Sequence, residues 1–146
     1  MAKPRPRPKL ARVQKIALPI LRAYPDLEGV KCGSWVEDVD YRNFPLINLR
    51  RIGGAGRNKK RPNQMALSVV EMTAYGDEDL PATEDLYDVA LEALYEAVRR
   101  QTVTPYGHLA SIRETMGATE FGSPFQDTWR VQGLIQLGIR PPRNKE

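Results

Sequence analysis

The side chains best suited to chemistry in this chain are the cations in and before a glycine-rich stretch, residues 53–62. They are Arg50, Arg51, Arg57, Lys59, Lys60 and Arg61. Glycines beside cations are typical of phosphate-binding loops, but a P-loop needs a second glycine directly before its lysine, and Asn58 precedes Lys59 here. The dinucleotide pattern fails as well, because Lys59 occupies the place of its third glycine. We therefore expect no specific nucleotide binding.

Other catalytic or metal-binding patterns are missing from the sequence. His108 is the single histidine and Cys32 the single cysteine, so an internal disulfide is excluded and an ordinary zinc site cannot be assembled. No Gly-x-Ser-x-Gly elbow occurs, and the acids of the predicted strands are too few and too scattered for metal-dependent nuclease chemistry. We expect a protein that is not an enzyme and that has no catalytic, cofactor-binding or metal-binding residues.

Charge is divided along the chain. The totals are 22 basic and 18 acidic residues, but residues 1–62 carry 15 of the basic and only 5 of the acidic groups. Residues 63–98 carry 9 acidic groups and no basic one. A nucleic-acid-binding domain would more often be basic over its whole surface, whereas this chain has two opposite poles.

The acidic pole includes one face of a predicted helix. Its four acids are Asp85, Asp88, Glu92 and Glu96. We expect them to lack a cationic partner within their own helix, which leaves them available to a second molecule. Our hypothesis is that the six cations above and these four acids form an assembly contact; the alternative is a solvated loop beside a solvated helix face.

Apolar periodicity places these groups on secondary structure. Residues 9–24 and 77–101 recur at the 3.6-residue period of helices, the first with Pro19 inside it. Residues 30–36, 45–52, 65–75, 109–116 and 129–139 are typical of strands, and the last alternates most regularly. Gly53 to Pro62 is predicted to be a long loop and residues 118–124 a second loop.

The predicted order is αβββαββ. It indicates an α+β fold with a single layer of mostly antiparallel sheet and both helices on one face. We expect one domain over residues 9–141, preceded by a disordered basic, proline-rich arm (1–8) and followed by a polar tail (142–146). No apolar run is long enough for a transmembrane helix and no signal peptide is evident, so we expect a cytoplasmic product without membrane contact.

The order of elements and several short phrases resemble one known family. A helix ends in LRAYPDLEGV, a strand ends in INLRRIGG before the basic loop, a strand ends in TAYG, and the last strand reads WRVQGLIQLGIR. Over about residues 9–141 this resembles the tail terminator proteins of long-tailed (siphovirus-type) bacteriophages. The family has no catalytic residues to carry over.

The resemblance implies a structural virion protein that forms a homohexameric ring on the tail tube and ends tube polymerisation. Its implied partners are the tail-tube protein and the head-completion or connector proteins, with DNA passing through the channel without specific recognition. It implies the head-proximal end of the tail in the virion, and the host cytoplasm during assembly.

Two alternatives remain at this point. One is a head–tail connector or head-closure ring protein, which is also small and not enzymatic. The other is a small nucleic-acid-binding module that uses the basic arm and loop on phosphates, although few aromatic residues lie near the cations for base stacking.

Overall fold

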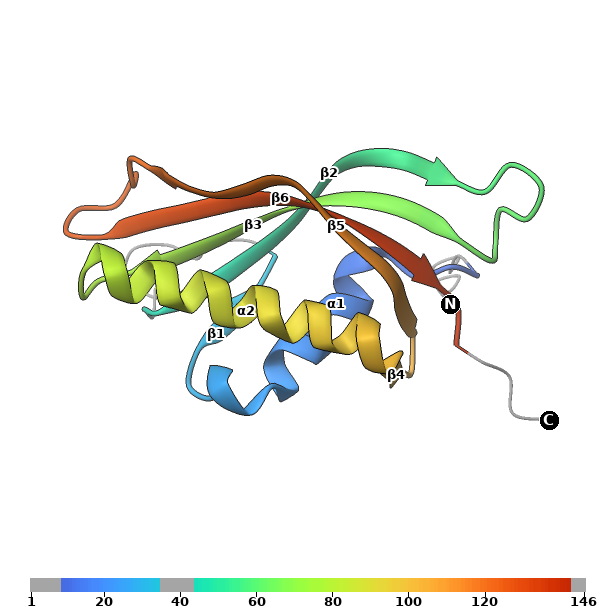
Figure 1. Ribbon diagram of the computed structural model, residues 1–146, viewed down its shortest axis with the longest axis horizontal. Coiled ribbons are helices and arrows are strands. Elements are labelled where there is room, and N and C mark those ends of the chain that lie inside the picture. The colour runs from blue at the N-terminus through green and yellow to red at the C-terminus, as the bar shows by residue number, and fades with distance from the viewer. Residues whose placement is uncertain (1–8, 35–43, 143–146) are drawn as a thin grey trace, which may run out of the picture.

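The computed structural model describes residues 9–34 and 44–142, which form a six-stranded mixed sheet with both helices on one face (Figure 1). The strand order is β1-β2-β3-β6-β5-β4, with β1 parallel to β2 and all other neighbours antiparallel. The elements are α1 (Val13–Ala23), a 3-10 turn η1 (Pro25–Leu27), β1 (Lys31–Gly33), β2 (Leu46–Arg57), β3 (Ala66–Gly76), α2 (Leu80–Arg100), β4 (Val103–Thr104), β5 (Gly107–Phe121) and β6 (Trp129–Arg140).

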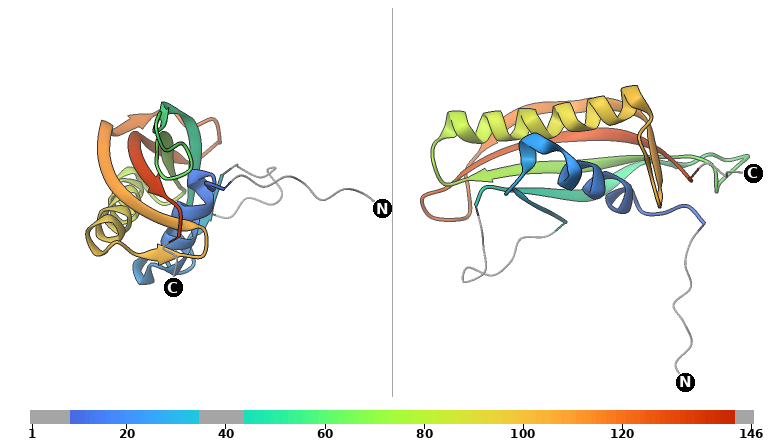
Figure 2. Two further views of the ribbon diagram at one scale, coloured as in Figure 1. Left: turned by 90° about the vertical axis from the view of Figure 1, so that its right-hand side faces the viewer. Right: turned by 90° about the horizontal axis from the view of Figure 1, so that it is seen from below.

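The α+β class, the single sheet layer and the common face of the two helices agree with the prediction. The predicted order lacked β4 and η1. The predicted arm, most of the C-terminal tail and the end of the predicted strand 30–36 lie outside the described residues. Figure 2 shows the curled sheet from two further sides; in its right-hand view, from below, α1 and α2 lie in front of the sheet.

The core lies between the helices and the two central strands. β3 and β6 pair without a register shift from Ala66↔Ile139 to Gly76↔Trp129. Alternate residues of each strand face the helices and are buried, as the period of two predicts. In β3 these are Ala66, Ser68, Val70, Met72 and Ala74, and in β6 they are Val131, Gly133, Ile135, Leu137 and Ile139.

The helix α2 begins at Leu80 because Asp79 caps it. The Asp79 carboxylate accepts a hydrogen bond from the backbone N–H of Ala82 at 2.8 Å, which satisfies one of the free donors of the first turn. The helix ends at Gln101, which takes the left-handed conformation. Tyr87, Ala90, Ala93, Leu94 and Ala97 are its buried apolar side chains, and the alanines allow a close approach to the sheet.

The helix α1 is continuous through Pro19, so the backbone donor that this residue lacks does not divide the helix in two. It begins at Val13 rather than at Lys9, yet Leu10 before it is still buried in the core. The side chains of Val13, Ile16, Ala17 and Leu21 face the core, which α1 closes beside α2.

The loop predicted over residues 53–62 is wrong in its first half, whereas residues 58–62 do lie in the connection between β2 and β3. Residues 53–57 continue β2, and bulges between Arg51 and Gly56 let the strand bend instead of ending it. Gly54, at φ +127°, has the backbone of Ser68 and Val69 where a Cβ would lie, so only glycine fits. β5 likewise runs to Phe121, through part of the loop predicted at 118–124.

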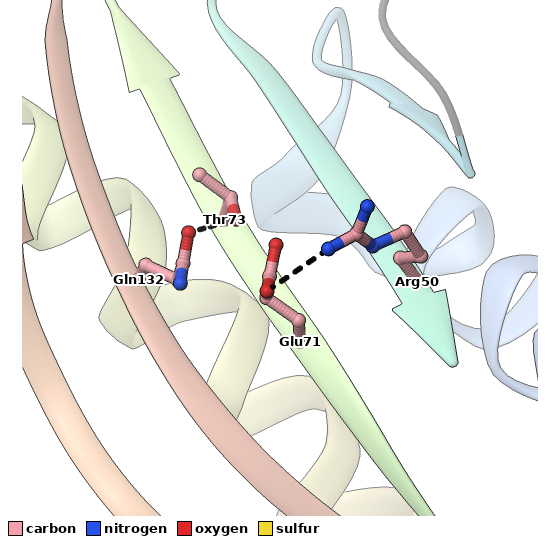
Figure 3. A network of polar contacts seen from close by, with 4 residues as sticks. All are labelled: Arg50, Glu71, Thr73 and Gln132. Carbon is pink, nitrogen blue, oxygen red and sulfur yellow. Dashed lines mark hydrogen bonds and ion pairs between the residues drawn. The ribbon is translucent and has the colours of Figure 1, made fainter. Parts of the chain in front are cut away.

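The face of the sheet without helices carries polar pairs across its strands (Figure 3). Arg50 of β2 contacts Glu71 of β3 at 3.4 Å, and the Thr73 hydroxyl donates a hydrogen bond to Gln132 of β6 at 3.2 Å. The Arg50 side chain is 60% exposed, so this ion pair contributes little to stability.

Candidate functional site

Four of the six predicted cations lie at the end of the β2–β3 hairpin; they are Arg57, Lys59, Lys60 and Arg61, and we call this end the tip. The hairpin projects at one end of the long axis of the molecule (Figure 1). Asn58 closes the tip, because its side-chain oxygen accepts hydrogen bonds from the backbone N–H groups of Lys60 (2.9 Å) and Arg61 (3.2 Å). Its own N–H donates to the Met65 carbonyl at 3.0 Å. The tip is therefore a structured turn between paired strands.

The tip cations are exposed, and among the described residues none of them forms an ion pair. Arg57 contacts only the side-chain oxygen of Asn63, at 3.4 Å. Arg50 and Arg51 do not extend this patch as one surface, because adjacent strand residues face opposite sides of the sheet. The predicted set of six thus separates into a cluster of four at the tip and two residues further down the strand.

The four predicted acids differ in their surroundings. Asp85, Asp88 and Glu92 are exposed on α2. Glu96 is half-buried and forms an ion pair with Arg100, one helical turn further on, at 2.9 Å. The expectation that these acids lack a partner within their helix is therefore wrong for Glu96, which lies near the basic last turn of α2.

At the other end of the molecule is a groove that the sequence did not reveal. We call it the acidic groove: it encloses about 220 Å³ and is lined by Asp26, Pro45, Gly76, Asp77, Glu78, Ala82, Thr83, Asp85, Leu86 and Val89. Its residues come from η1, the start of β2, the end of β3 and the first turns of α2. Apolar side chains form part of its wall, and none of the described residues that line it is a lysine or an arginine.

The basic end has a cleft of its own. It is lined by Asn58, Arg61, Gln64, Met65, Gln101, His108, Arg140 and Pro141, and none of these described residues is acidic. The tip cations and the carboxylates of the acidic groove thus lie at opposite ends of the long axis of the fold. The tip of the hairpin lies at one end and the β3–α2 turn at the other (Figure 1).

The arrangement offers no evident covalent or metal chemistry. Within the described residues no three His, Cys, Asp or Glu side chains gather in a way that could hold a metal ion. Cys32 in β1 is buried, and burial raises the pKa of its thiol, which disfavours the nucleophilic thiolate. His108 is buried in β5, and three strands separate it from β1 in the sheet. Neither described helix has the length and apolar composition that a membrane span needs.

The phage tail termination protein family matches residues 9–146 of this chain. The chain belongs to this family. This tail termination protein is 59% identical to the Gene 22 protein of Mycobacterium phage L5 over 135 residues, which are 92% of this chain and 96% of the relative. It is 55% identical to the Gene 22 protein of Mycobacterium phage D29 over the same length and coverage.

The fold of this tail termination protein also occurs in a solved virion. A chain of the native gene transfer agent particle matches with a TM-score of 0.61 and 16% identity, covering 88% of this chain and 94% of that one. At this identity the likeness concerns the fold. The family places this protein among the structural components of phage tails and confirms the resemblance seen in the sequence.

Proposed function

We propose that this tail termination protein closes the end of the phage tail tube as a homohexameric ring. The ring ends tube polymerisation and presents a surface to the head-completion or connector proteins, and DNA passes through its channel without specific recognition. The protein acts at the head-proximal end of the tail, assembles in the host cytoplasm, and performs no catalysis. The observation that carries the proposal is the family match across residues 9–146.

The charge distribution supports a ring in preference to a two-fold dimer. A two-fold contact centred on either end would bring that end of both copies together, so like charges would face each other. Contact between opposite ends is head-to-tail, and such contacts close into a ring when the rotation per subunit permits. The hairpin tip and the acidic groove lie at opposite ends, as a head-to-tail contact requires.

Electron microscopy of the purified protein, alone and after incubation with purified tail tubes, tests the proposal. The expected result is six-fold rings that sit on tube ends and prevent further addition of tube protein. Rings that bind only a head connector would favour the head-closure alternative. A monomer that shifts only on DNA, with an affinity that falls steeply with salt, would favour the nucleic-acid-binding alternative.

A further inference from the structure

We propose that the acidic groove of one copy receives the tip of the β2–β3 hairpin of the next copy. The inference rests on the proposed ring and names the surfaces that build it. The acidic side of the contact is then the groove around the β3–α2 turn. It is not the outer face of α2 that the sequence suggested, which includes Asp88 and Glu92. The occupant is a second copy of this chain.

Charge complementarity is the first argument. The tip carries Arg57, Lys59, Lys60 and Arg61, and the sequence has no acid between Phe44 and Val70. The groove presents the carboxylates of Asp26, Asp77, Glu78 and Asp85. Among the described residues neither set finds an ion-pair partner in its own chain.

The shape of the groove is the second argument. Lysine and arginine carry apolar stems behind their charged ends, and they bind best where apolar surface adjoins carboxylates. Leu86 and Val89 of α2 and Pro45 before β2 supply such surface in the groove wall. A volume near 220 Å³ greatly exceeds the roughly 10–15 Å³ that one water molecule requires, so a long side chain can enter.

Position is the third argument. The tip extends beyond the helices at one end, and the β3–α2 turn that borders the groove lies at the opposite end, so a copy would reach its neighbour and not itself (Figure 1). The tip is also ordered by the hydrogen bonds of Asn58 and by strand pairing at its base. Little conformational entropy is then lost on docking.

Matched charge reversals test the contact. The hairpin variant is Lys59→Glu with Lys60→Glu, and the groove variant is Glu78→Lys with Asp85→Lys. Each alone should associate about tenfold more weakly or not at all, because the reversal cancels the net charge of one surface and places two like-charged pairs in the contact. An equal mixture of the two variants should regain rings, since the two new glutamates at the tip of one can pair with the two new lysines in the groove of the other. Sedimentation velocity and electron microscopy measure both effects.

The control is Asp88→Lys with Glu92→Lys, which makes the same change of charge on α2 outside the groove. It should assemble like the unchanged protein. The proposed contact would be overturned if the control and the groove variant lost ring assembly equally. It would also be overturned if the mixture of the hairpin and groove variants regained no rings. Circular dichroism before mixing checks that each variant is folded.

The two proposals fail in different ways. If the unchanged protein forms no ring, alone or on tail tubes, the proposed function fails. If rings form and the hairpin and groove variants still assemble, the ring stands and only this contact is overturned. A hairpin variant that loses affinity for DNA while its rings persist would also overturn the contact.

Discussion

The hydroxyl oxygen of Tyr87, on α2, occupies the space that a Cβ atom on Gly133 of β6 would fill. That Cβ would also lie 2.9 Å from the backbone oxygen of Met116 on β5. Tyr87 is fully buried, and its hydroxyl has no hydrogen-bond partner among the described residues. The absence of a side chain at Gly133 therefore sets how closely α2 approaches the sheet.

Gly133→Ala should destabilise the protein by about 1–3 kcal/mol, because the added methyl group overlaps both the tyrosine and a backbone oxygen. The free energy of unfolding from urea titration measures the loss. Gly117→Ala on β5 is the control, since nothing lies within 4 Å of its Cβ position. It should change stability by at most about 0.5 kcal/mol. Equal effects at the two glycines would refute the packing argument.

Tyr87→Phe should be neutral or slightly stabilising near neutral pH, because the lost hydroxyl is buried without a partner. Burial, with Glu114 and Asp88 nearby, raises the pKa of Tyr87 above its ordinary 10.0. The unfolded chain then loses this proton at lower pH than the folded chain does. Stability is full below pH 10.0 and falls above it, by up to about 1.4 kcal/mol per pH unit.

Urea titrations from about pH 8 to pH 11 check this sign by comparing the unchanged protein with Tyr87→Phe. The variant should gain relative stability as the pH rises through 10.0, because it lacks the group that titrates. A constant difference across the range would show that the folded and unfolded states release the Tyr87 proton alike.

Asp79→Ala should lower the free energy of unfolding by about 1 kcal/mol, because the N–H of Ala82 loses its acceptor. Asp79→Asn should keep most of the stability, since the amide oxygen can still accept. Asp77→Ala removes an exposed acid outside the helix and serves as the control. If Asp77→Ala and Asp79→Ala lowered the free energy of unfolding equally, the loss would come from the change of net charge and not from the lost helix cap.

Gly54→Ala should destabilise the hairpin by about 1–3 kcal/mol, because the left-handed φ is strained for alanine and its Cβ would meet the opposite strand. Hydrogen exchange should show faster exchange in β2 and β3 at the hairpin end. The neighbouring change Ala55→Gly should cost at most about 1 kcal/mol. Under the proposed hairpin contact, Gly54→Ala should also weaken ring assembly.

Local sequence patterns were sufficient to predict most of the helices and strands. α2 was predictable because Ala90, Leu94 and Ala97 recur at helical spacing and Asp79 stands at the cap. β6 was predictable because its alternation has one buried face. The continuation of β2 was missed because glycines usually end a strand, whereas here they permit bulges that keep the pairing with β3.

The candidate site was only partly predictable. The tip cations are adjacent in sequence, so composition alone drew attention to them. The acidic groove joins Asp26, Pro45 and Glu78, which lie on separate elements and meet only in the folded chain. The run Asp77–Asp79 was visible as a cluster of charge, but nothing local tells which acids share a groove. The burial of Tyr87 was not predicted, because its aliphatic neighbours Leu86, Val89 and Ala90 already satisfy the helical period.

The three-residue strand β1 has a consequence for the outer edge of the sheet. It pairs only with Leu46, Ile47 and Asn48 of β2, so beyond these residues β2 has no strand on its outer side among the described residues. A long, flat, unpaired edge invites fibre growth by strand addition. Here bulges interrupt the ladder and the cations of β2 repel an identical strand. The glycines that shape the hairpin thereby make this edge a poor template for fibres.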